Sequence, residues 1–138
     1  MALVCDTGPV LASLDRDDPD HFRCADLLLH TPEDLVIPGL VLAELDYWCH
    51  KLGLGAAWLV FLEDVEAGIW RIEWPTSADL RRARQLQVTY ADAALGVVDA
   101  SVIALVERLK EPKVATLDRR HFSFVRPAHL PAIRLLPD

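Results

Sequence analysis

Four acidic residues lie in sequence contexts that are unusual for ordinary surface acids. Asp6 and Asp118 follow short apolar runs typical of buried strands, while Glu44 and Asp99 lie inside segments with helical spacing. Residues 97–103 around Asp99 are otherwise almost entirely apolar, which is unusual for a solvated acid. These contexts make the four acids candidates for a shared site.

A cluster of carboxylates predicts a bound cation. Two carboxylates about 4 Å apart repel each other by about 4 kcal/mol at an effective dielectric constant near 20. Oxygen ligands alone favour Mg²⁺ or Mn²⁺. Taken singly, each acid has a simpler explanation: Asp6 as a helix cap, Glu44 as a helix-surface acid and Asp118 as a turn residue. Only their joint placement indicates a metal site.

Short apolar runs alternate with amphipathic segments along the whole chain. Strands are predicted at residues 3–5, 35–37, 69–74, 114–117 and 133–136. Helices are predicted after the turn at residues 6–9 and at residues 19–29, 40–52, 56–65, 77–88 and 92–110. This alternation predicts a single α/β domain over residues 1–138, with a doubly wound parallel sheet of about five strands flanked by helices. In such sheets the active site lies beyond the carboxyl ends of the strands, where the winding direction reverses.

The predicted helix over residues 92–110 places two of the acids together. Asp92 would begin this helix, and Asp99 would lie two turns further along on the same face.

Composition indicates a soluble, cytoplasmic protein. The 138 residues are 52% hydrophobic and 25% charged, which suits one packed domain. The three cysteines show no zinc-binding spacing and are expected to be reduced. No signal peptide and no membrane-spanning segment is predicted.

The charge is divided unevenly between the halves of the chain. The formal net charge is −7, but residues 1–67 carry a net −10 and residues 68–138 a net +3. An acidic metal site with a mildly basic remainder would produce this division, and so would an acidic face that binds a basic partner. Ordinary surface variation is the simplest alternative.

Four motifs, in this order, resemble those of a known family. They are Leu3-Val4-Cys5-Asp6-Thr7, Val41-Leu42-Ala43-Glu44-Leu45, Leu95-Gly96-Val97-Val98-Asp99-Ala100 and Ala115-Thr116-Leu117-Asp118-Arg119-Arg120-His121-Phe122. Together they cover nearly the whole chain and resemble the PIN domain, more closely the VapC toxins of bacterial and archaeal toxin–antitoxin pairs. The resemblance implies an acidic pocket that binds one or two Mg²⁺ or Mn²⁺ ions and cleaves structured RNA, such as tRNA or rRNA, endonucleolytically.

The same resemblance assigns roles to individual residues. Asp6, Glu44, Asp99 and Asp118 match the metal-binding acids of the family. Thr7 and Thr116 match positions where the family often has a hydroxyl near the metal, and Asp92 matches an acid near the helix start, where it could also be only a cap. Asp6 and Asp99 would be direct ligands, with Glu44 and Asp118 completing a second position or acting through water. His121 is interpreted as structural or RNA-facing.

Several basic residues could hold RNA, because the arginine guanidinium bonds phosphate in a bidentate manner. Arg119 and Arg120 lie beside the predicted pocket. Arg81, Arg82 and Arg84 share one predicted helix, where an ordinary solvated face is an equally good explanation.

The resemblance also implies a protein partner. In the family, a small antitoxin often inserts a basic residue into the acidic pocket, and the toxins usually form homodimers. Aromatic and apolar residues near Glu44, which are Tyr47, Trp48, Trp58, Leu59 and Phe61, would form core and in part an interface.

Other functions fit less well. A housekeeping RNA-processing nuclease and a catalytically silent PIN module share the same fold, although the presence of all four acids disfavours the silent module. A haloacid-dehalogenase-like phosphatase would need an aspartate where Gly8 stands. A receiver domain would need a second acid beside Asp6, where Cys5 stands.

Overall fold

Five short parallel strands form one sheet in the order β3-β2-β1-β4-β5, in a computed structural model that describes residues 1–138. The strands are β1 (Ala2–Cys5), β2 (Asp34–Pro38), β3 (Trp70–Glu73), β4 (Lys113–Ala115) and β5 (Arg134–Leu136). The helices are α1 (Thr7–Leu14), α2 (His21–His30), α3 (Gly39–Lys51), α4 (Gly55–Glu66), α5 (Ser77–Thr89), α6 (Val97–Leu109) and α7 (Arg119–Phe124), with a 3₁₀ turn η1 (Ala91–Ala93). The predicted fold class is confirmed.

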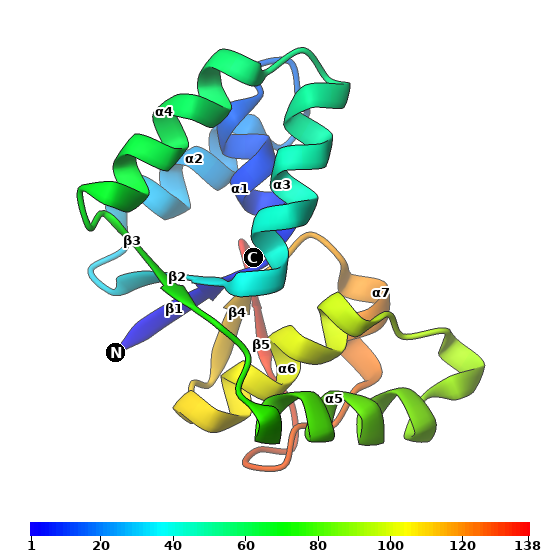
Figure 1. Cartoon of the computed structure of the whole chain (residues 1–138). Coiled ribbons are helices and arrows are strands. Elements are labelled where there is room, and N and C mark those ends of the chain that lie inside the picture. The colour runs from blue at the N-terminus through cyan, green and yellow to red at the C-terminus, as the bar shows by residue number, and fades with distance from the viewer.

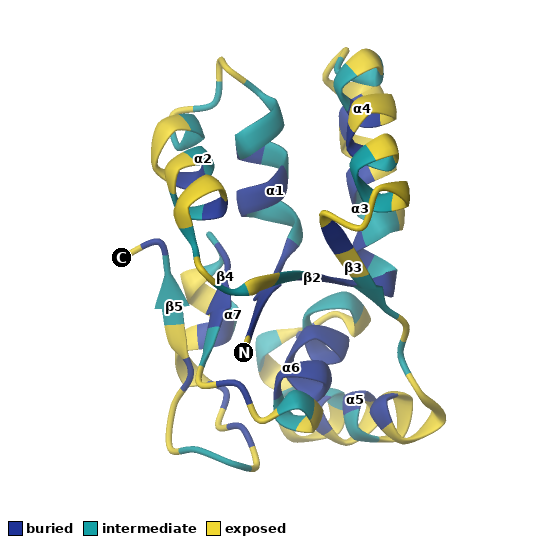
Figure 2. Ribbon diagram, turned by 90° about the vertical axis from the view of Figure 1, so that its left-hand side faces the viewer, coloured by how far each residue is buried: buried dark blue, intermediate teal, exposed yellow.

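Helices cover both faces of the sheet. Helices α1 to α4 lie on one face and α5 and α6 on the other (Figure 1). Leu3, Val4 and Cys5 of β1 are fully buried, which explains why this strand is apolar at every position. On the second face, α6 lies against the sheet and α5 packs outside it, so the buried residues of α6 run without a break from Ala100 to Val106 (Figure 2). None of the helices is both long and apolar enough to cross a lipid bilayer.

The winding direction reverses between β1 and β4. The chain first builds outward from β1 through β2 to β3, then returns to the other side of β1 for β4 and β5. Val4 therefore pairs with Val36 on one side and with Val114 on the other. Beyond β1, the backbone N–H of Asp6 donates to the carbonyl of Ala115 at 2.8 Å, so the carboxyl ends of β1 and β4 stay together. A doubly wound sheet places its site at this reversal.

Helix α6 begins later than predicted. The helix starts at Val97, whereas Asp92 belongs to the separate turn η1 and is exposed. Ala94 adopts a left-handed conformation, with φ of 53°, which interrupts any helix running from η1 into α6. The prediction that Asp92 and Asp99 share a helix face is therefore wrong, and Asp99 lies in the first turn of α6.

The region after β4 also differs from the prediction. The strand ends at Ala115 rather than at residue 117, because the chain turns there to begin α7, a helix that the sequence analysis did not predict. Asp118 is the N-cap of α7, and its carboxylate accepts a hydrogen bond from the backbone N–H of His121. A short polar helix with one buried residue, Phe122, has almost no hydrophobic periodicity to reveal it.

Helix α3 starts where the backbone must approach an indole ring. A Cβ added at Gly39 would lie 2.3 Å from Cε3 of Trp74, closer than two carbon atoms can pack. The glycine therefore lets α3 leave the end of β2 close against this ring, and the direction of α3 determines where Glu44 points.

Candidate metal centre

Asp6 is a nearly inaccessible carboxylate at the reversal point of the sheet. It follows β1 directly and is only 5% exposed. It occupies the N-cap position of α1, yet its side chain makes no capping hydrogen bond. Instead, the hydroxyl of the fully buried Thr116 donates to Oδ2 of Asp6 at 2.8 Å. Burial, with the charges of Glu44 and Asp118, raises the pKa of Asp6 to about 6, against the lowering effect of the hydrogen bonds from Thr7 and Thr116.

Asp99 faces the same place from α6. Its side chain is 20% exposed. Burial, followed by the nearby charges of Asp6, Asp118 and Glu44, raises the pKa of Asp99 to about 7, against the lowering effect of His121. A carboxyl group with a pKa near neutrality is a sign of negative charges held close together with little water between them.

Glu44 is held by a hydroxyl from a neighbouring helix. The side chain of Thr7, the first residue of α1, donates to Oε1 of Glu44 in α3 at 2.5 Å. This bond joins the two helices that follow β1 and β2. It leaves the other oxygen of Glu44 without a partner in the protein, so that oxygen remains free to accept from water or to bind a cation.

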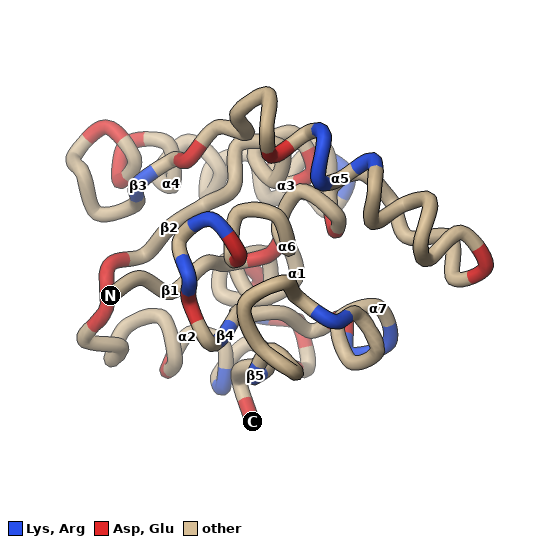
Figure 3. The backbone as a smooth tube through the Cα atoms, turned by 90° about the horizontal axis from the view of Figure 1, so that it is seen from below, with Lys and Arg blue, Asp and Glu red and all other residues tan.

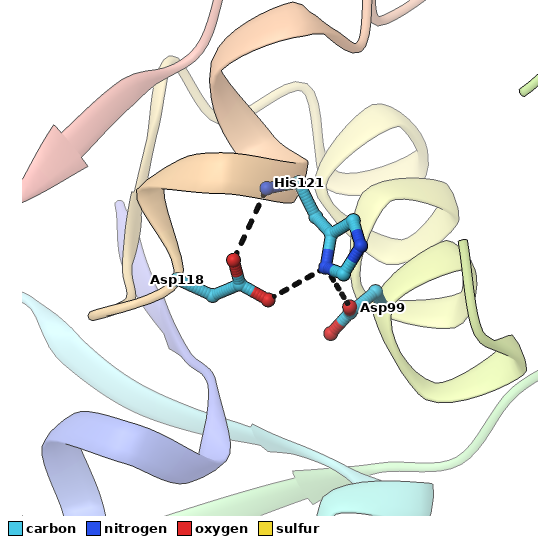
Figure 4. Close-up of side chains that lie close together, drawn as sticks. All are labelled: Asp99, Asp118 and His121. Carbon is cyan, nitrogen blue, oxygen red and sulfur yellow. Dashed lines mark hydrogen bonds and ion pairs between the residues drawn. The ribbon is translucent and has the colours of Figure 1, made fainter. Parts of the chain in front are cut away.

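Asp118 completes the cluster from the loop after β4. Its Oδ1 caps α7 through the backbone N–H of His121 at 3.1 Å, and its Oδ2 lies 2.8 Å from Nδ1 of the same histidine (Figure 4). Its own backbone N–H donates to the hydroxyl of Thr116 at 3.0 Å. Thr116 therefore connects Asp118 with Asp6 through one buried side chain.

The imidazole of His121 lies within the acidic cluster. Besides its contact with Asp118, Nδ1 is 3.3 Å from Oδ2 of Asp99, and Nε2 is 3.3 Å from the carbonyl oxygen of Ala93. The hydrogen bond to Asp118, followed by the charges of Asp118 and Asp99, raises the pKa of His121. His121 was predicted to be structural or RNA-facing, not to lie among the acids. The available signal was its spacing of three residues from Asp118, which puts both side chains on one side of a helix start.

The structure thus brings together all four acids that the sequence singled out. Asp6 and Asp99 each experience the charges of Glu44 and Asp118, although the four residues come from four different segments. Hard carboxylate oxygens suit Mg²⁺ or Mn²⁺, and a divalent cation would offset the repulsion that raises the two pKa values. In addition, Asp99, Asp118 and His121 each offer one ligand atom within 4.8 Å of the others. The donor set therefore fits a divalent ion.

Asp92 lies apart from this cluster. It is exposed in η1, and its charge is not among the causes that raise the pKa of Asp6 or Asp99. An auxiliary role for Asp92 stays a prediction.

The candidate RNA-binding arginines divide into bonded and free side chains. Arg82 is bonded to both carboxylate oxygens of Glu107 in α6, at 2.8 and 2.9 Å, so it joins α5 to α6. The guanidinium of Arg119 donates to the carbonyl of Pro137 at 2.6 Å. Of the five candidates, Arg81 and Arg84 in α5 and Arg120 in α7 are exposed and form neither an ion pair nor a side-chain hydrogen bond. The basic segments of α5 and α7 are visible in Figure 3.

Comparison with known proteins agrees with this geometry. A sequence profile of the PIN domain matches residues 3–129. The chain is 32% identical over 126 residues to "Ribonuclease VapC26" of Mycobacterium tuberculosis, an alignment that covers 91% of this chain and 93% of the relative.

Solved structures share the fold at lower sequence identity. VapC20 of Mycobacterium tuberculosis, described as a sarcin-ricin loop cleaving toxin, superposes with a TM-score of 0.75 at 18% identity, covering 81% of this chain and 86% of that one. VapBC2 of Rickettsia felis, solved bound to a DNA fragment from its promoter, has a TM-score of 0.67 at 16% identity and covers 98% and 97% of the two chains. A toxin–antitoxin complex from Klebsiella pneumoniae has the same TM-score and identity, covering 95% and 98%. With a profile that spans most of the chain, a relative at 32% identity and an acidic centre at the reversal of the sheet, the protein belongs to the PIN domain family.

Proposed function

We propose that this protein is an Mg²⁺- or Mn²⁺-dependent endoribonuclease, the toxin of a toxin–antitoxin pair, which hydrolyses phosphodiester bonds in structured RNA such as tRNA or rRNA. The observation that carries the proposal is the convergence of Asp6, Glu44, Asp99 and Asp118, with the pKa of Asp6 raised to about 6 and that of Asp99 to about 7. Ribonuclease activity in a relative that aligns over almost its whole length supports the reaction class.

Each residue of the centre has a separable task in this proposal. Asp6 and Asp99, the two acids with raised pKa values, would hold the divalent ion directly, and Glu44 and Asp118 would complete the site. The ion, when bound, supplies positive charge that neutralises phosphoryl oxygens and acidifies a water molecule. Thr116 directs one oxygen of Asp6 and positions the backbone of Asp118, and so prevents the carboxylates from turning away from each other.

RNA would be held by arginines outside the acidic centre. Arg81, Arg84 and Arg120 are exposed and form no ion pair, so their guanidinium groups are available to phosphates. Because the chain as a whole carries −7, nonspecific affinity for RNA would be low, and the shape of a folded RNA would determine selectivity.

Cleavage assays test the reaction. The natural chain is incubated with tRNA and rRNA in Mg²⁺, in Mn²⁺ and in EDTA, beside the Asp6→Asn and Asp99→Asn variants. Each substitution is expected to lower the cleavage rate by at least ~100-fold, since indirect partners of a metal ion alone contribute about 10–100-fold. Asp92→Asn makes the same chemical change at an exposed acid of η1 and is expected to lower the rate much less; an equal loss would place Asp92 in the site. Full activity of the Asp6 and Asp99 variants, or activity in EDTA, would exclude metal-dependent catalysis at this centre.

The partner in this proposal is a small antitoxin that ends in an apolar segment and a basic side chain. Tyr47 and Trp48 lie one helical turn beyond Glu44 and are 56% and 43% exposed, so apolar surface adjoins the acidic centre. An apolar segment could cover these rings while its lysine or arginine meets the carboxylates. Similar folds have been solved as toxin–antitoxin assemblies.

A second apolar surface is suited to protein contacts. An open pocket of about 340 Å³ lies between α1, α2, α4 and the starts of β2 and β3, and eight of its ten lining residues are hydrophobic. On α4, Leu59 and Val60 are 61% and 55% exposed. We include a homodimer in the proposal, which light scattering of the purified chain would test.

Co-purification from the native operon tests the toxin assignment. The expected result is a complex with the antitoxin that cleaves RNA more slowly than the free protein. A chain that purifies alone and cleaves at full rate would instead indicate a housekeeping RNA-processing nuclease. A chain with neither metal binding nor cleavage would indicate a silent PIN module.

A further inference from the structure

We propose that His121 is a direct metal ligand, and that with Asp99 and Asp118 it forms a nitrogen-containing position that selects Mn²⁺ over Mg²⁺. The inference rests on the proposed function, because it places the ion in the same acidic centre. It goes further in assigning one ligand atom, Nδ1 of His121, and a metal preference.

The spacing of the three side chains matches that of neighbouring ligands around one ion. Nδ1 of His121 lies 2.8 Å from Oδ2 of Asp118 and 3.3 Å from Oδ2 of Asp99. Neighbouring ligands of an octahedral ion with bonds of about 2.1 Å are about 3.0 Å apart, between these two separations. Figure 4 shows the three side chains turned toward one another, Asp99 from α6, Asp118 from the loop before α7 and His121 from α7.

A backbone carbonyl contacts the imidazole of His121 on the side opposite the two carboxylates. Nε2 of His121 is 3.3 Å from the carbonyl oxygen of Ala93, and a carbonyl can only accept a hydrogen bond. Nε2 must therefore carry a proton, and when a cation displaces the proton from Nδ1 the ring presents its lone pair there. Histidines that bind metals almost always donate their other ring N–H to a carbonyl or a carboxylate, which fixes both tautomer and orientation.

The lone pair of Nδ1 and the two carboxylates repel one another in the absence of a positive charge. A lone pair at Nδ1 aimed at two carboxylate oxygens is repulsive, so the position requires positive charge between the three atoms. Asp6 and Glu44 add further negative charge around Asp99. A divalent cation satisfies all three atoms at once, whereas a single proton on Nδ1 must be shared between two acceptors.

A purely structural explanation competes with metal binding. In that explanation a protonated His121 donates from Nδ1 and orients Asp118 and Asp99, and any group that donates from the same place would serve. The two explanations need opposite properties of Nδ1, a hydrogen-bond donor in one and a lone pair in the other. In His121→Asn, the side-chain NH₂ takes approximately the place of Nδ1 and donates, but it has no lone pair to bind a metal ion.

The identity of the ligand atom determines the metal preference. Mg²⁺ prefers oxygen ligands and keeps several waters, whereas imidazole nitrogen suits transition metals. Removal of Nδ1 is therefore expected to weaken Mn²⁺ binding by about 10–100-fold, while Mg²⁺ binding changes by less than about 3-fold. The ratio of the two affinities is a readout that does not depend on catalytic activity.

Pulsed electron paramagnetic resonance of the Mn²⁺-loaded full chain tests the assignment. A nitrogen bound directly to Mn²⁺ produces ¹⁴N modulation, expected in the natural chain and absent in His121→Asn. Calorimetric titrations with Mn²⁺ and with Mg²⁺ give the affinity ratio for both proteins. His50→Asn is the matched control, because His50 also faces one aspartate, Asp46 at 3.3 Å, on an exposed part of α3.

The outcomes separate this inference from the proposed function. In one outcome the natural chain binds Mn²⁺ and Asp99→Asn abolishes the binding, but the natural chain shows no nitrogen modulation, or His121→Asn has an unchanged ratio of Mn²⁺ to Mg²⁺ affinity. This outcome overturns the role of His121 and leaves the nuclease proposal standing. A natural chain that binds no Mn²⁺ overturns both. If His121→Asn does not fold, ¹⁵N-labelled histidine in the natural chain decides the question, since the modulation must then change from ¹⁴N to ¹⁵N.

Discussion

Neutralising Asp99 is expected to stabilise the metal-free protein at alkaline pH, even though the substitution removes a residue of the centre. The pKa of Asp99 is raised from 3.8 to about 7, chiefly by burial and then by the charges of Asp6 and Asp118. In the folded state the ionised carboxylate is therefore a source of strain. Asparagine keeps nearly the same shape and cannot ionise.

The sign and size of the effect follow from proton linkage. Between pH 3.8 and about 7 the folded protein keeps a proton on Asp99 that the unfolded chain releases, so the free energy of unfolding falls as the pH rises through this window. At 1.36 kcal/mol per pKa unit the full cost above pH 7 is about 4 kcal/mol. Because the protein relaxes around a repelled charge, we expect Asp99→Asn to gain about 2–4 kcal/mol at pH 8 and less than about 1 kcal/mol at pH 4.

Urea denaturation in EDTA at the two pH values measures this difference. Asp17→Asn is the matched control, because Asp17 is exposed and takes no part in the cluster. Added Mn²⁺ should then cancel or reverse this difference: at 1,000 times its dissociation constant it stabilises the natural chain by about 4.1 kcal/mol, and the variant by much less.

Two results would refute the reasoning. A variant no more stable than the natural chain at pH 8 would mean that neither burial nor the charges of the cluster destabilise the ionised Asp99. An equal gain at pH 4 and pH 8 would mean that the substitution acts through packing rather than through ionisation.

Three further substitutions test the surroundings of the centre. Thr116→Val removes a fully buried hydroxyl that bonds two of the acids and should cost about 1–3 kcal/mol of unfolding free energy; retention of full stability would contradict the bonding described. Gly39→Ala should cost about 0.5–1.5 kcal/mol, because the added Cβ displaces the ring of Trp74, a side chain that is 62% exposed. Trp74→Leu in the same chain should recover part of the loss, and the absence of a recovery would disprove the clash. Arg82→Gln should lower the free energy of unfolding by about 1–3 kcal/mol and leave RNA binding intact. Arg81→Gln should reduce the slope of log binding constant against log salt concentration for RNA by about 0.7–0.9. The opposite pattern would show that the bonded arginine is the one that contacts RNA.

Much of this molecule follows from local sequence patterns. The strands could be predicted because a parallel sheet covered on both faces needs uninterrupted apolar runs, and Leu3, Val4 and Cys5 are such a run. Placing Asp6 and Asp118 near each other needed only the rule that doubly wound sheets put the ends of their central strands together. Glu44 and Asp99 were candidates from their helical context and, for Asp99, its apolar neighbours, and the resemblance to PIN domains joined them to the other two acids.

Other features were decided by the tertiary structure. The start of α6 depends on the left-handed conformation of Ala94, which no hydrophobic period reports. The guanidinium group of Arg82 is bonded to Glu107, whereas that of Arg81 is not, and the sequence alone does not distinguish the two arginines.

The position of His121 among the acids could not be predicted from sequence patterns. Its Nδ1 meets Asp118, three residues away, only because a short helix begins there, and it meets Asp99 only because α6 packs beside that helix start. Hydrophobic periodicity records which residues are buried within one element, because burial repeats with the geometry of that element. The distance between polar atoms of different elements depends on how those elements pack, and a displacement of about 1 Å decides whether a side chain can bind the metal ion.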